Sequence, residues 1–429
     1  MQIDSLKNHY VRYHKSQYRF WGLVLIFAVF LTPISMTVRG DSVSANYSFI
    51  LFPFLILCTR GMLQVPNKKI LALIFIYIII FITCFAYQYY YLAFWERRLI
   101  SFILFMSIFT FFFVKIDDQM VRAFTSAIIL VSFIYSSNSI YTYFLNGGSK
   151  LGFEFIRPIV QSQRYGFILL LGFWLAVFHK TSSNLGFLAK LLVITIIFNG
   201  LGLTFSRSSV AGLLASSSTL LLLLFLKLKE TSFTISSKTL NHIILCSVIA
   251  ALILSISYYL IPDYFQFFSE RLLNRSITPI QDGYFSFQKF RPYDTYVYNQ
   301  LESSEGYRLF MIMQVITYLS ANPLFGSGFL GVWIMFDDLA GASHNQLLDV
   351  LFRTGLVGFT GFIFILYKLL NYNFGSRNIA VFVSMIGILA VGMFHETFKL
   401  SQGAFIFAFL IAHAFNADNY YRRIVALRT

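Results

Sequence analysis

Long apolar segments recur along the whole chain and are separated by short polar stretches. A helix needs about 20 residues to cross roughly 30 Å of hydrocarbon, and most of these segments come close to that length. The pattern predicts about twelve membrane-spanning helices. The expected spans are residues 20–36, 47–63, 70–88, 99–114, 123–144, 165–178, 187–205, 208–226, 242–261, 346–367, 379–394 and 403–415. We therefore expect an all-α polytopic membrane protein in which residues 1–429 form a single integral membrane domain.

One connection is much longer than the others and joins the ninth and tenth spans, over residues 262–344. Within it, the apolar positions of the segment 305–323 recur with a helical period, and Asn322-Pro323 ends the pattern. This periodicity predicts an amphipathic helix that lies on the membrane surface.

Composition agrees with a membrane protein. The chain is 57% hydrophobic and only 12% charged, which is far from the composition of soluble domains. The first apolar segment follows a basic stretch and precedes no small-residue cleavage site, so it is expected to be a signal anchor. The three cysteines, Cys58, Cys84 and Cys246, fall inside expected spans and form no disulfide framework or metal motif.

The distribution of Lys and Arg predicts the orientation of the chain in the membrane. Basic residues concentrate in alternate short loops, beginning with Lys7, Arg12, Lys15 and Arg19 before the first span. Because such loops stay in the cytoplasm, both termini are expected there and the loop 262–344 on the outer side. Anionic lipid accounts for most of the formal net charge of +15, so no nucleic-acid partner is expected.

Unusual polar residues gather on the predicted outer side, and the first group is the tight turn TFSRSS at residues 204–209. Arg207 lies there at the membrane boundary, surrounded by hydroxyl groups. It either extends to lipid headgroups or binds an anion, because a guanidinium can grip phosphate oxygens with two parallel hydrogen bonds. These two interpretations remain open for this residue.

Two further features of the long loop carry charge. Arg308 lies in the first turns of the amphipathic segment, where it can form a surface ion pair with Glu302 or Glu305 or bind a substrate. The adjacent aspartates Asp337 and Asp338 are too weak a pattern to predict a metal site.

The segment SHNQLLDVLFRTGLVG, residues 343–358, contains the clearest chemical signal. Ser343 and Gln346 have the spacing of a capping box, which places His344 at the first position of the tenth helix. The positive end of the helix dipole would keep the imidazole neutral near pH 7, so His344 is a candidate general base. An exposed histidine at a helix start is the structural alternative.

Deeper in the same helix, Asp349 and Arg353 are spaced as an i, i+4 ion pair. Gly355, Gly358 and Gly361 are expected to form a smooth face for close packing against another helix.

Three of these motifs, in this order, resemble the O-antigen ligase and O-antigen polymerase superfamily of bacterial membrane glycosyltransferases. They are Thr204-Phe205-Ser206-Arg207 between two spans, Gly306-Tyr307-Arg308 at the start of the loop helix, and His344-Asn345 followed by nine residues and Gly355-Leu356-Val357-Gly358. The resemblance covers roughly residues 160–400. Its last motif is fairly specific, and each arginine motif is weak by itself.

The resemblance implies a metal-independent glycosyltransferase of the bacterial inner membrane with a periplasmic active site and no cofactor. His344 would activate the acceptor hydroxyl, and Arg207 and Arg308 would hold a lipid diphosphate. Arg157 and Arg164 are further candidates for substrate contact. The expected partners are an undecaprenyl-diphosphate-linked oligosaccharide, membrane lipid and a chain-length regulator protein.

The motifs leave the acceptor open. An O-antigen polymerase transfers glycan to a lipid-linked repeat unit and is favoured; an O-antigen ligase transfers glycan to lipid A-core. A flippase or other transporter is less favoured, because no internal repeat is visible and the long outer loop suits chemistry outside the cytoplasm.

Overall fold

The computed structural model describes residues 34–38, 41–45, 63–87, 94–145, 162–227, 304–335, 343–375 and 378–426, apart from positions 115, 117, 180, 182, 205, 396, 399 and 400. From Leu63 onward the described secondary structure is helical, with one isolated β-bridge between Leu63 and Val114. The expected helical architecture is confirmed for this part of the chain.

Most of the expected spans coincide with described helices. The helices are α3 (Lys68–Tyr87), α4 (Trp95–Met106), η2 (Ser107–Phe113), α5 (Asp118–Leu145), α7 (Ser162–Phe178), α8 (Asn184–Leu203), α9 (Arg207–Lys227), α14 (Ser304–Ala321), η4 (Val332–Met335), α15 (Gln346–Gly375), α16 (Ile379–Gly392) and α17 (Ser401–Ala426). Among the described residues, α3, α5, α8, α9 and α15 include segments long and apolar enough to cross a membrane. The chain is thus a multi-pass membrane protein by length and composition of its helices, and the total of about twelve spans stays a prediction.

A short hairpin was not expected. Strand β1 (Ile34–Val38) pairs antiparallel with β2 (Asp41–Ala45), so that Ile34 lies opposite Ala45. In β1 apolar and polar residues alternate strictly, which is the pattern of a strand and not of a helix. The expected span 20–36 therefore extends three residues too far. The rest of it, residues 47–62 of the expected span 47–63 and the whole span 242–261 lie outside the described residues.

The expected span 99–114 is also not one regular helix. It is split into α4 and the 3-10 helix η2 at Ser107. The Ser107 hydroxyl donates to the Leu104 carbonyl, and the Thr110 hydroxyl donates to the Ser107 carbonyl, and such bonds compete with regular helical ones. The Gln64 side chain then donates to the carbonyls of Phe112 and Val114 and holds the end of η2.

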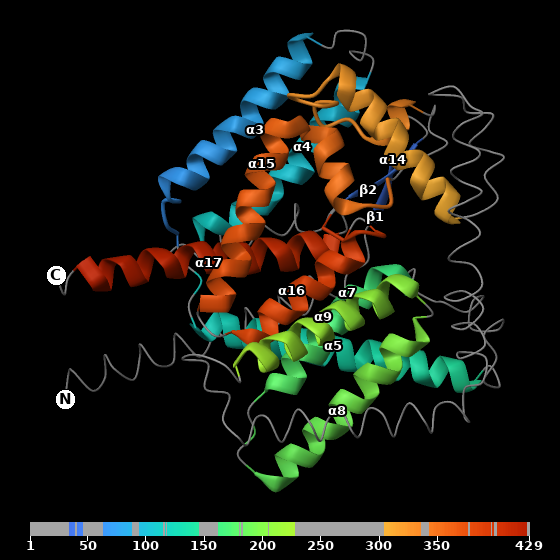
Figure 1. Cartoon of the computed structure of the whole chain (residues 1–429), viewed down its shortest axis with the longest axis vertical. Coiled ribbons are helices and arrows are strands. Elements are labelled where there is room, and N and C mark those ends of the chain that lie inside the picture. Colours follow the sequence, from blue (N-terminus) through green and yellow to red (C-terminus); the bar gives the residue numbers. More distant parts are fainter. Residues whose placement is uncertain are drawn as a thin grey trace.

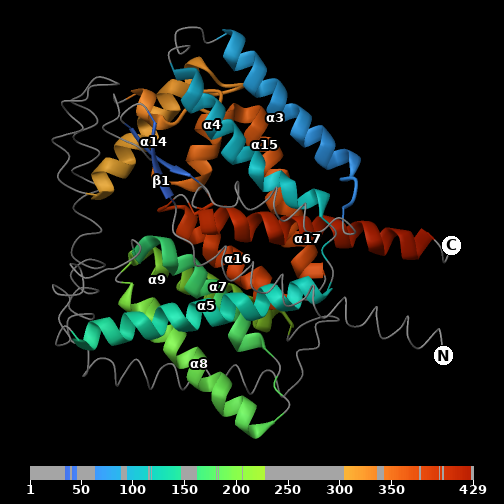
Figure 2. The same cartoon turned by 180° about the vertical axis from the view of Figure 1, so that it is seen from behind.

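The described helices form two groups with α17 between them (Figures 1 and 2). One group contains α3, α4, α14 and α15, and the other contains α5, α7, α8, α9 and α16. Helix α16 packs on α9 and α7, while α17 packs on η2 and α15. Phe409 of α17 also stacks on Phe124 of α5, so the last helix joins the group that carries the His344 motif to the group that contains the Arg207 turn.

Helices α9 and α16 approach each other at two glycines. A Cβ atom built on Gly212 would lie 2.8 Å from the Gly387 carbonyl oxygen, and one on Gly387 would lie 2.7 Å from the Gly212 oxygen. Gly212 also faces Val391, and Gly387 faces Ser216. This register makes the helices antiparallel, so the start of α9 lies beside the end of α16.

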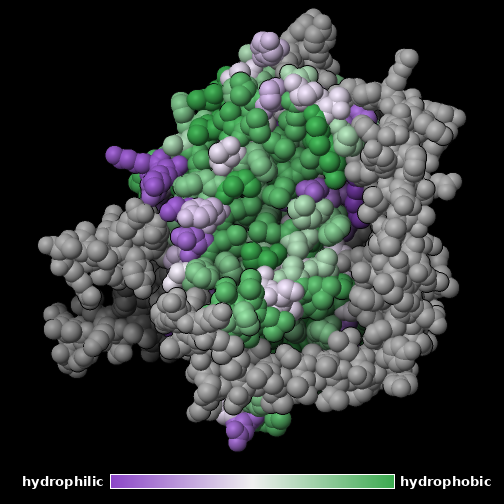
Figure 3. Space-filling model, viewed as in Figure 1, coloured by the Kyte–Doolittle hydropathy of each residue, from purple (hydrophilic) through white to green (hydrophobic). Residues whose placement is uncertain are grey.

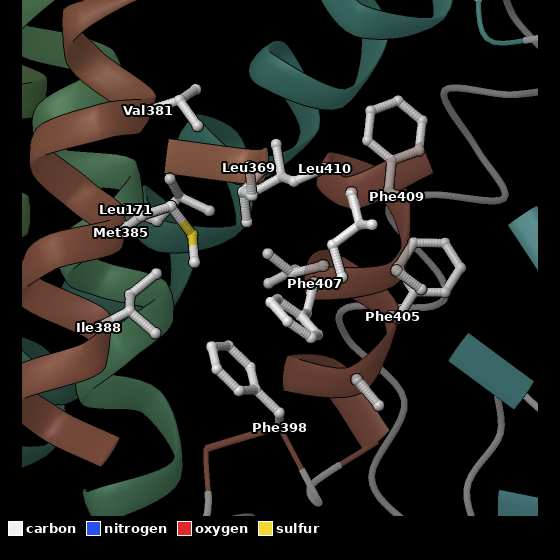
Figure 4. Packing of buried hydrophobic residues seen from close by; sticks show 14 of the residues in the cluster. Leu171, Leu369, Val381, Met385, Ile388, Phe398, Phe405, Phe407, Phe409 and Leu410 are labelled. Atoms are coloured by element: carbon white, nitrogen blue, oxygen red, sulfur yellow. The ribbon is translucent and has the colours of Figure 1, made fainter. Parts of the chain in front are cut away.

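The core between the two groups is rich in aromatic side chains. Figure 4 shows Leu171 of α7 and three side chains of α16 facing phenylalanines and Leu410 of α17, with Leu369 of α15 among them. Phe398 and Phe407 stack with their ring centroids 3.9 Å apart. The described part of the face shown in Figure 3 is also predominantly hydrophobic, as lipid contact requires.

Candidate functional site

His344 lies immediately before α15 and not at its first position. The side-chain oxygen of Asn345 accepts a hydrogen bond from the Leu348 N–H at 3.0 Å, so Asn345 is the N-cap. Helix α15 begins at Gln346. The capping box expected from Ser343 is therefore wrong, because asparagine is as good a cap as serine and stands two residues closer to the helix.

The real cap leaves His344 in an unusual backbone conformation. Its φ angle is +52°, in the left-handed region that histidine adopts more often than most residues. The hydroxyl of Ser343 donates to the Asn345 carbonyl at 2.9 Å and stabilises this turn. The His344 side chain is only partly buried, which leaves it accessible from outside the helix bundle.

Gln346 makes a different bond from the one that a capping box requires. Its side-chain oxygen accepts the backbone N–H of Phe398 at 2.7 Å. This bond joins the start of α15 to residues 393–398, the turn that follows α16. The turn is thereby held against the His344 segment.

A second histidine enters the site from this turn. The rings of His395 and His344 are perpendicular, with an interplanar angle of 78° and centroids 6.2 Å apart. His395 is buried, with 9% of its surface exposed. The sequence analysis missed it, although a His-Glu pair at the end of a hydrophobic span, on the predicted outer side, is a signal that could have identified it.

Arg308 reaches the same place from the loop helix. Helix α14 ends at Ala321, directly before Asn322-Pro323, which confirms the expected stop. The guanidinium carbon of Arg308 lies 5.8 Å from the centroid of the Phe394 ring, next to His395 in the chain. One face of α14, including Met311 and Val315, is buried in a cluster with Phe352 of α15, which confirms that the helix is one-sided.

The environment of His395 disfavours its charged form. Burial is the main cause, and the charges of Arg308 and His344 add to it; together they lower the pKa of His395 to about 3. His395 is therefore neutral over the whole physiological pH range. Arg308, His344 and His395 form one electrostatically coupled group, which we call the outer cluster.

The start of α9 lies at the same end of the molecule. Helix α8 ends at Leu203 and α9 begins at Arg207, so the tight turn expected at residues 204–209 is confirmed. The hydroxyl oxygens of Ser206 and Ser208 are 2.7 Å apart. Because α9 runs antiparallel to α16, this turn lies beside the end of α16, where His395 follows.

Not every expected site residue is placed. The backbone of Arg207 starts α9 and that of Arg164 lies in α7, but the side chains of both are outside the described residues, as is the whole of Arg157. Asp337 and Asp338 are also outside them. Within the described ranges, no three His, Cys, Asp or Glu side chains gather as a metal site would require.

Helix α15 is interrupted below His344. Gly355 has φ 61° and ψ −169°, which breaks the helix after nine residues. The N–H groups of Leu356 and Val357 donate to the carbonyls of Pro323 and Leu324, at 2.9 and 3.2 Å. In return, the N–H groups of Ser327 and Phe329 donate to carbonyls of α15, each at 2.8 Å.

The expected ion pair stabilises the short first part of α15. Arg353 donates to the Asp349 carboxylate at 2.8 Å, to the Ser101 hydroxyl at 2.6 Å and to the Phe329 carbonyl at 3.0 Å. Gly358 and Gly361 pack against α3, as expected, and the Tyr77 hydroxyl donates to the Gly358 carbonyl at 2.8 Å. Gly355 has another role, because it forms the break and not the packing face.

The comparisons agree with the motifs. No curated protein matches the chain. Residues 191–363 match the family model described as O-antigen ligase, a range that includes the turn at Arg207, helix α14 and both parts of the His344 motif. Over this range, the chain is similar to the O-antigen ligase family.

Proposed function

We propose that this protein is an O-antigen polymerase of the bacterial inner membrane. It transfers glycan from undecaprenyl diphosphate onto a lipid-linked repeat unit at the periplasmic face. The observation that supports this most directly is the outer cluster: Arg308 and His344, from two separate motifs of the matched range, lie around His395, and the turn of the third motif lies at the same end of the molecule.

The diphosphate leaving group needs fixed positive charge, because negative charge develops on it as the glycosidic bond breaks. We assign this role to Arg308 and Arg207, whose planar guanidinium groups can bind phosphate oxygens in a bidentate way. Arg308 is held at the site by α14, which is packed on α15 through its buried face. Arg157 and Arg164 stay candidates for further substrate contacts.

His344 is proposed as the general base. It takes the proton from a hydroxyl of the acceptor sugar while that oxygen bonds to the anomeric carbon of the donor, and the bond from that carbon to the diphosphate breaks. Proton transfer to a positioned base contributes about a hundredfold to ten-thousandfold to a rate. We propose that the transfer needs no metal ion, and that lipid-linked saccharide, membrane lipid and a chain-length regulator are its partners.

A ligase is the second candidate, and the description of the matching family as O-antigen ligase favours it. Polymerase and ligase use the same donor chemistry and differ in acceptor. Deletion of the gene distinguishes them by gel analysis of the surface glycan. Caps of a single repeat unit mean a polymerase, and full-length polymer left on its lipid carrier means a ligase.

Replacement of His344 tests the proposed chemistry. The left-handed backbone makes His344→Asn a better variant than His344→Ala, since asparagine tolerates this conformation and its amide takes no proton at neutral pH. Transfer should be lost at normal expression, whereas exposed His179→Asn should retain it. Adding EDTA should leave the wild-type rate unchanged. Normal transfer by the His344→Asn variant would show that His344 is not the general base.

A further inference from the structure

His395 is the buried titratable group of the outer cluster to which neither the motifs nor the proposed chemistry gives a task. It lies in the turn after α16, and its main chain is held on both sides. Its N–H donates to the Val391 carbonyl at 3.1 Å, and its carbonyl accepts from Thr397 N–H at 3.0 Å. The Gln346–Phe398 bond then fixes the turn to the start of α15. The imidazole is thus presented at a defined position beside His344.

The neighbours of His395 give no structural reason for a polar side chain at this position. Within the described residues, neither ring nitrogen of His395 makes a hydrogen bond, although only 9% of the residue is exposed. Neither nitrogen is among the described buried side-chain atoms that lack a hydrogen-bond partner, so neither is sealed in an apolar environment. The ring nitrogens are therefore suited to a partner that is absent when the site is empty.

The charged and titratable groups that face His395 decide which form it takes. Arg308 approaches from α14 and His344 from the start of α15. The side chains of Arg207, Glu396 and Lys399 are outside the described residues. A neutral imidazole carries one N–H donor and one acceptor nitrogen. It can therefore donate a hydrogen bond to a sugar hydroxyl or accept one from it. Because its own pKa is low, it does not take the hydroxyl proton in place of His344.

We propose that His395 is a second, uncharged imidazole of the active site that hydrogen-bonds the acceptor saccharide and directs its reacting hydroxyl toward His344. This role rests on the proposed function and adds a residue to it. The ring centroids of the two histidines are 6.2 Å apart, so one sugar residue bound beside the rings can contact both. His344 accepts the proton, and His395 orients the sugar that supplies it.

The test separates hydrogen bonding from packing. His395→Phe keeps a ring of similar size but removes both ring nitrogens, and His395→Asn keeps a donor and an acceptor in a smaller side chain. The substrate is the lipid-linked repeat unit extracted from the deletion strain itself, and the rate is measured from pH 5 to pH 9. A lost orienting hydrogen bond should slow transfer about tenfold in His395→Phe, whereas His395→Asn should stay within about threefold of wild type. The acid limb of the pH profile should not move in either variant.

The matched control is His413→Phe. His413 is a partly buried histidine of α17 whose Nε2 lies 3.5 Å from the Tyr372 hydroxyl oxygen. It stands about 18 Å along α17 from the first residue of this helix, Ser401, which follows the turn that carries His395. The His413→Phe variant should transfer glycan at the wild-type rate. If His395→Phe does not reach wild-type levels in the membrane, His395→Leu removes the same nitrogens with less volume and is judged by the same criterion.

Each outcome decides the question. A wild-type rate in His395→Phe or His395→Leu would overturn the proposal, because the ring would then be only packing. Equal loss in His395→Asn and His395→Phe, with disappearance of the acid limb, would also overturn it and make His395 the proton acceptor. His344→Asn in the same membranes reports on the proposed function separately: normal transfer there refutes the base assignment whatever the His395 variants do.

Discussion

The side-chain oxygen of Gln346 accepts the backbone N–H of Phe398 at 2.7 Å, across 52 residues of sequence. Both groups are buried, and the bond joins the first residue of α15 to the turn that carries His395. Two histidines that reach the site from different helices are thereby held in one arrangement. This hydrogen bond therefore helps to fix the distance between the two imidazole rings.

Gln346→Leu should therefore reduce transfer as well as stability. The Phe398 N–H would lose its acceptor in a buried environment, at a cost of about 1–3 kcal/mol. A lower melting temperature in detergent and a reduced rate with extracted substrate are the expected results. Asn373→Leu is the control, because this buried amide donates to the Leu369 carbonyl within its own helix and lies outside the outer cluster. A rate for Gln346→Leu equal to that of the control would show that the turn keeps its place without the bond.

Arg308→Lys should impair transfer although the charge is kept. An ammonium group is a point donor and cannot reproduce a bidentate grip on phosphate, so we expect a loss of about tenfold or more. Arg207→Lys should behave in the same way. Arg97→Lys is the matched control, because Arg97 also lies over an aromatic ring, 4.5 Å from the centroid of Trp333, but outside the outer cluster. If Arg308→Lys and Arg207→Lys transfer glycan as fast as the Arg97→Lys control, Arg308 and Arg207 contribute only their positive charge and no bidentate hydrogen bonding.

Gly355→Ala should destabilise the protein. The backbone there has φ 61°, and an added Cβ would lie 2.3 Å from the Leu324 carbonyl oxygen. A strained conformation of this kind costs about 1–3 kcal/mol. Gly375→Ala, at the end of the same helix, meets no atom within 4 Å and should be neutral. Thermal unfolding in detergent compares the two, and equal melting temperatures would mean that the break at Gly355 can close.

Acid should destabilise the folded protein through His395. Its pKa is about 3 when folded and near 6.5 when unfolded, so between these values the unfolded chain binds more protons. The stability contribution is therefore fully present above pH 6.5 and is lost as the pH falls. At pH 4.5 the loss amounts to about 3 kcal/mol. His395→Asn should show a smaller drop in melting temperature between pH 7.5 and pH 4.5 than wild type does, and an identical drop would assign the acid sensitivity to other groups.

The helices could largely be predicted from the sequence because each one carries its own signal. Helix α14 ends where Asn322-Pro323 requires it to end, and the ion pair between Asp349 and Arg353 depends only on spacing within one helix. The hairpin β1–β2 was missed because its alternating pattern is short and adjoins a hydrophobic segment that reads as a helix.

The site could be predicted only in part, since its residues meet through contacts between distant segments. His344 and Arg308 were identified from motifs. His395 was not, because its position depends on the bond from Gln346 to Phe398 and on the antiparallel packing of α9 and α16. The N-cap was wrong for a local reason: Ser343 and Asn345 are both good caps, and the capping-box spacing favoured the wrong one.

The connection between the interrupted helix α15 and residues 322–330 is made by main-chain groups, with four N–H···O bonds from Leu356, Val357, Ser327 and Phe329. Every amino acid except proline supplies these groups. Apart from Arg353, whose guanidinium also donates to the Phe329 carbonyl, side chains on both segments can change without separating Arg308 from His344, provided that the glycines permit the backbone path. A lineage of proteins with this fold can therefore change the surface of both segments while the distance between Arg308 and His344 is inherited through the peptide backbone.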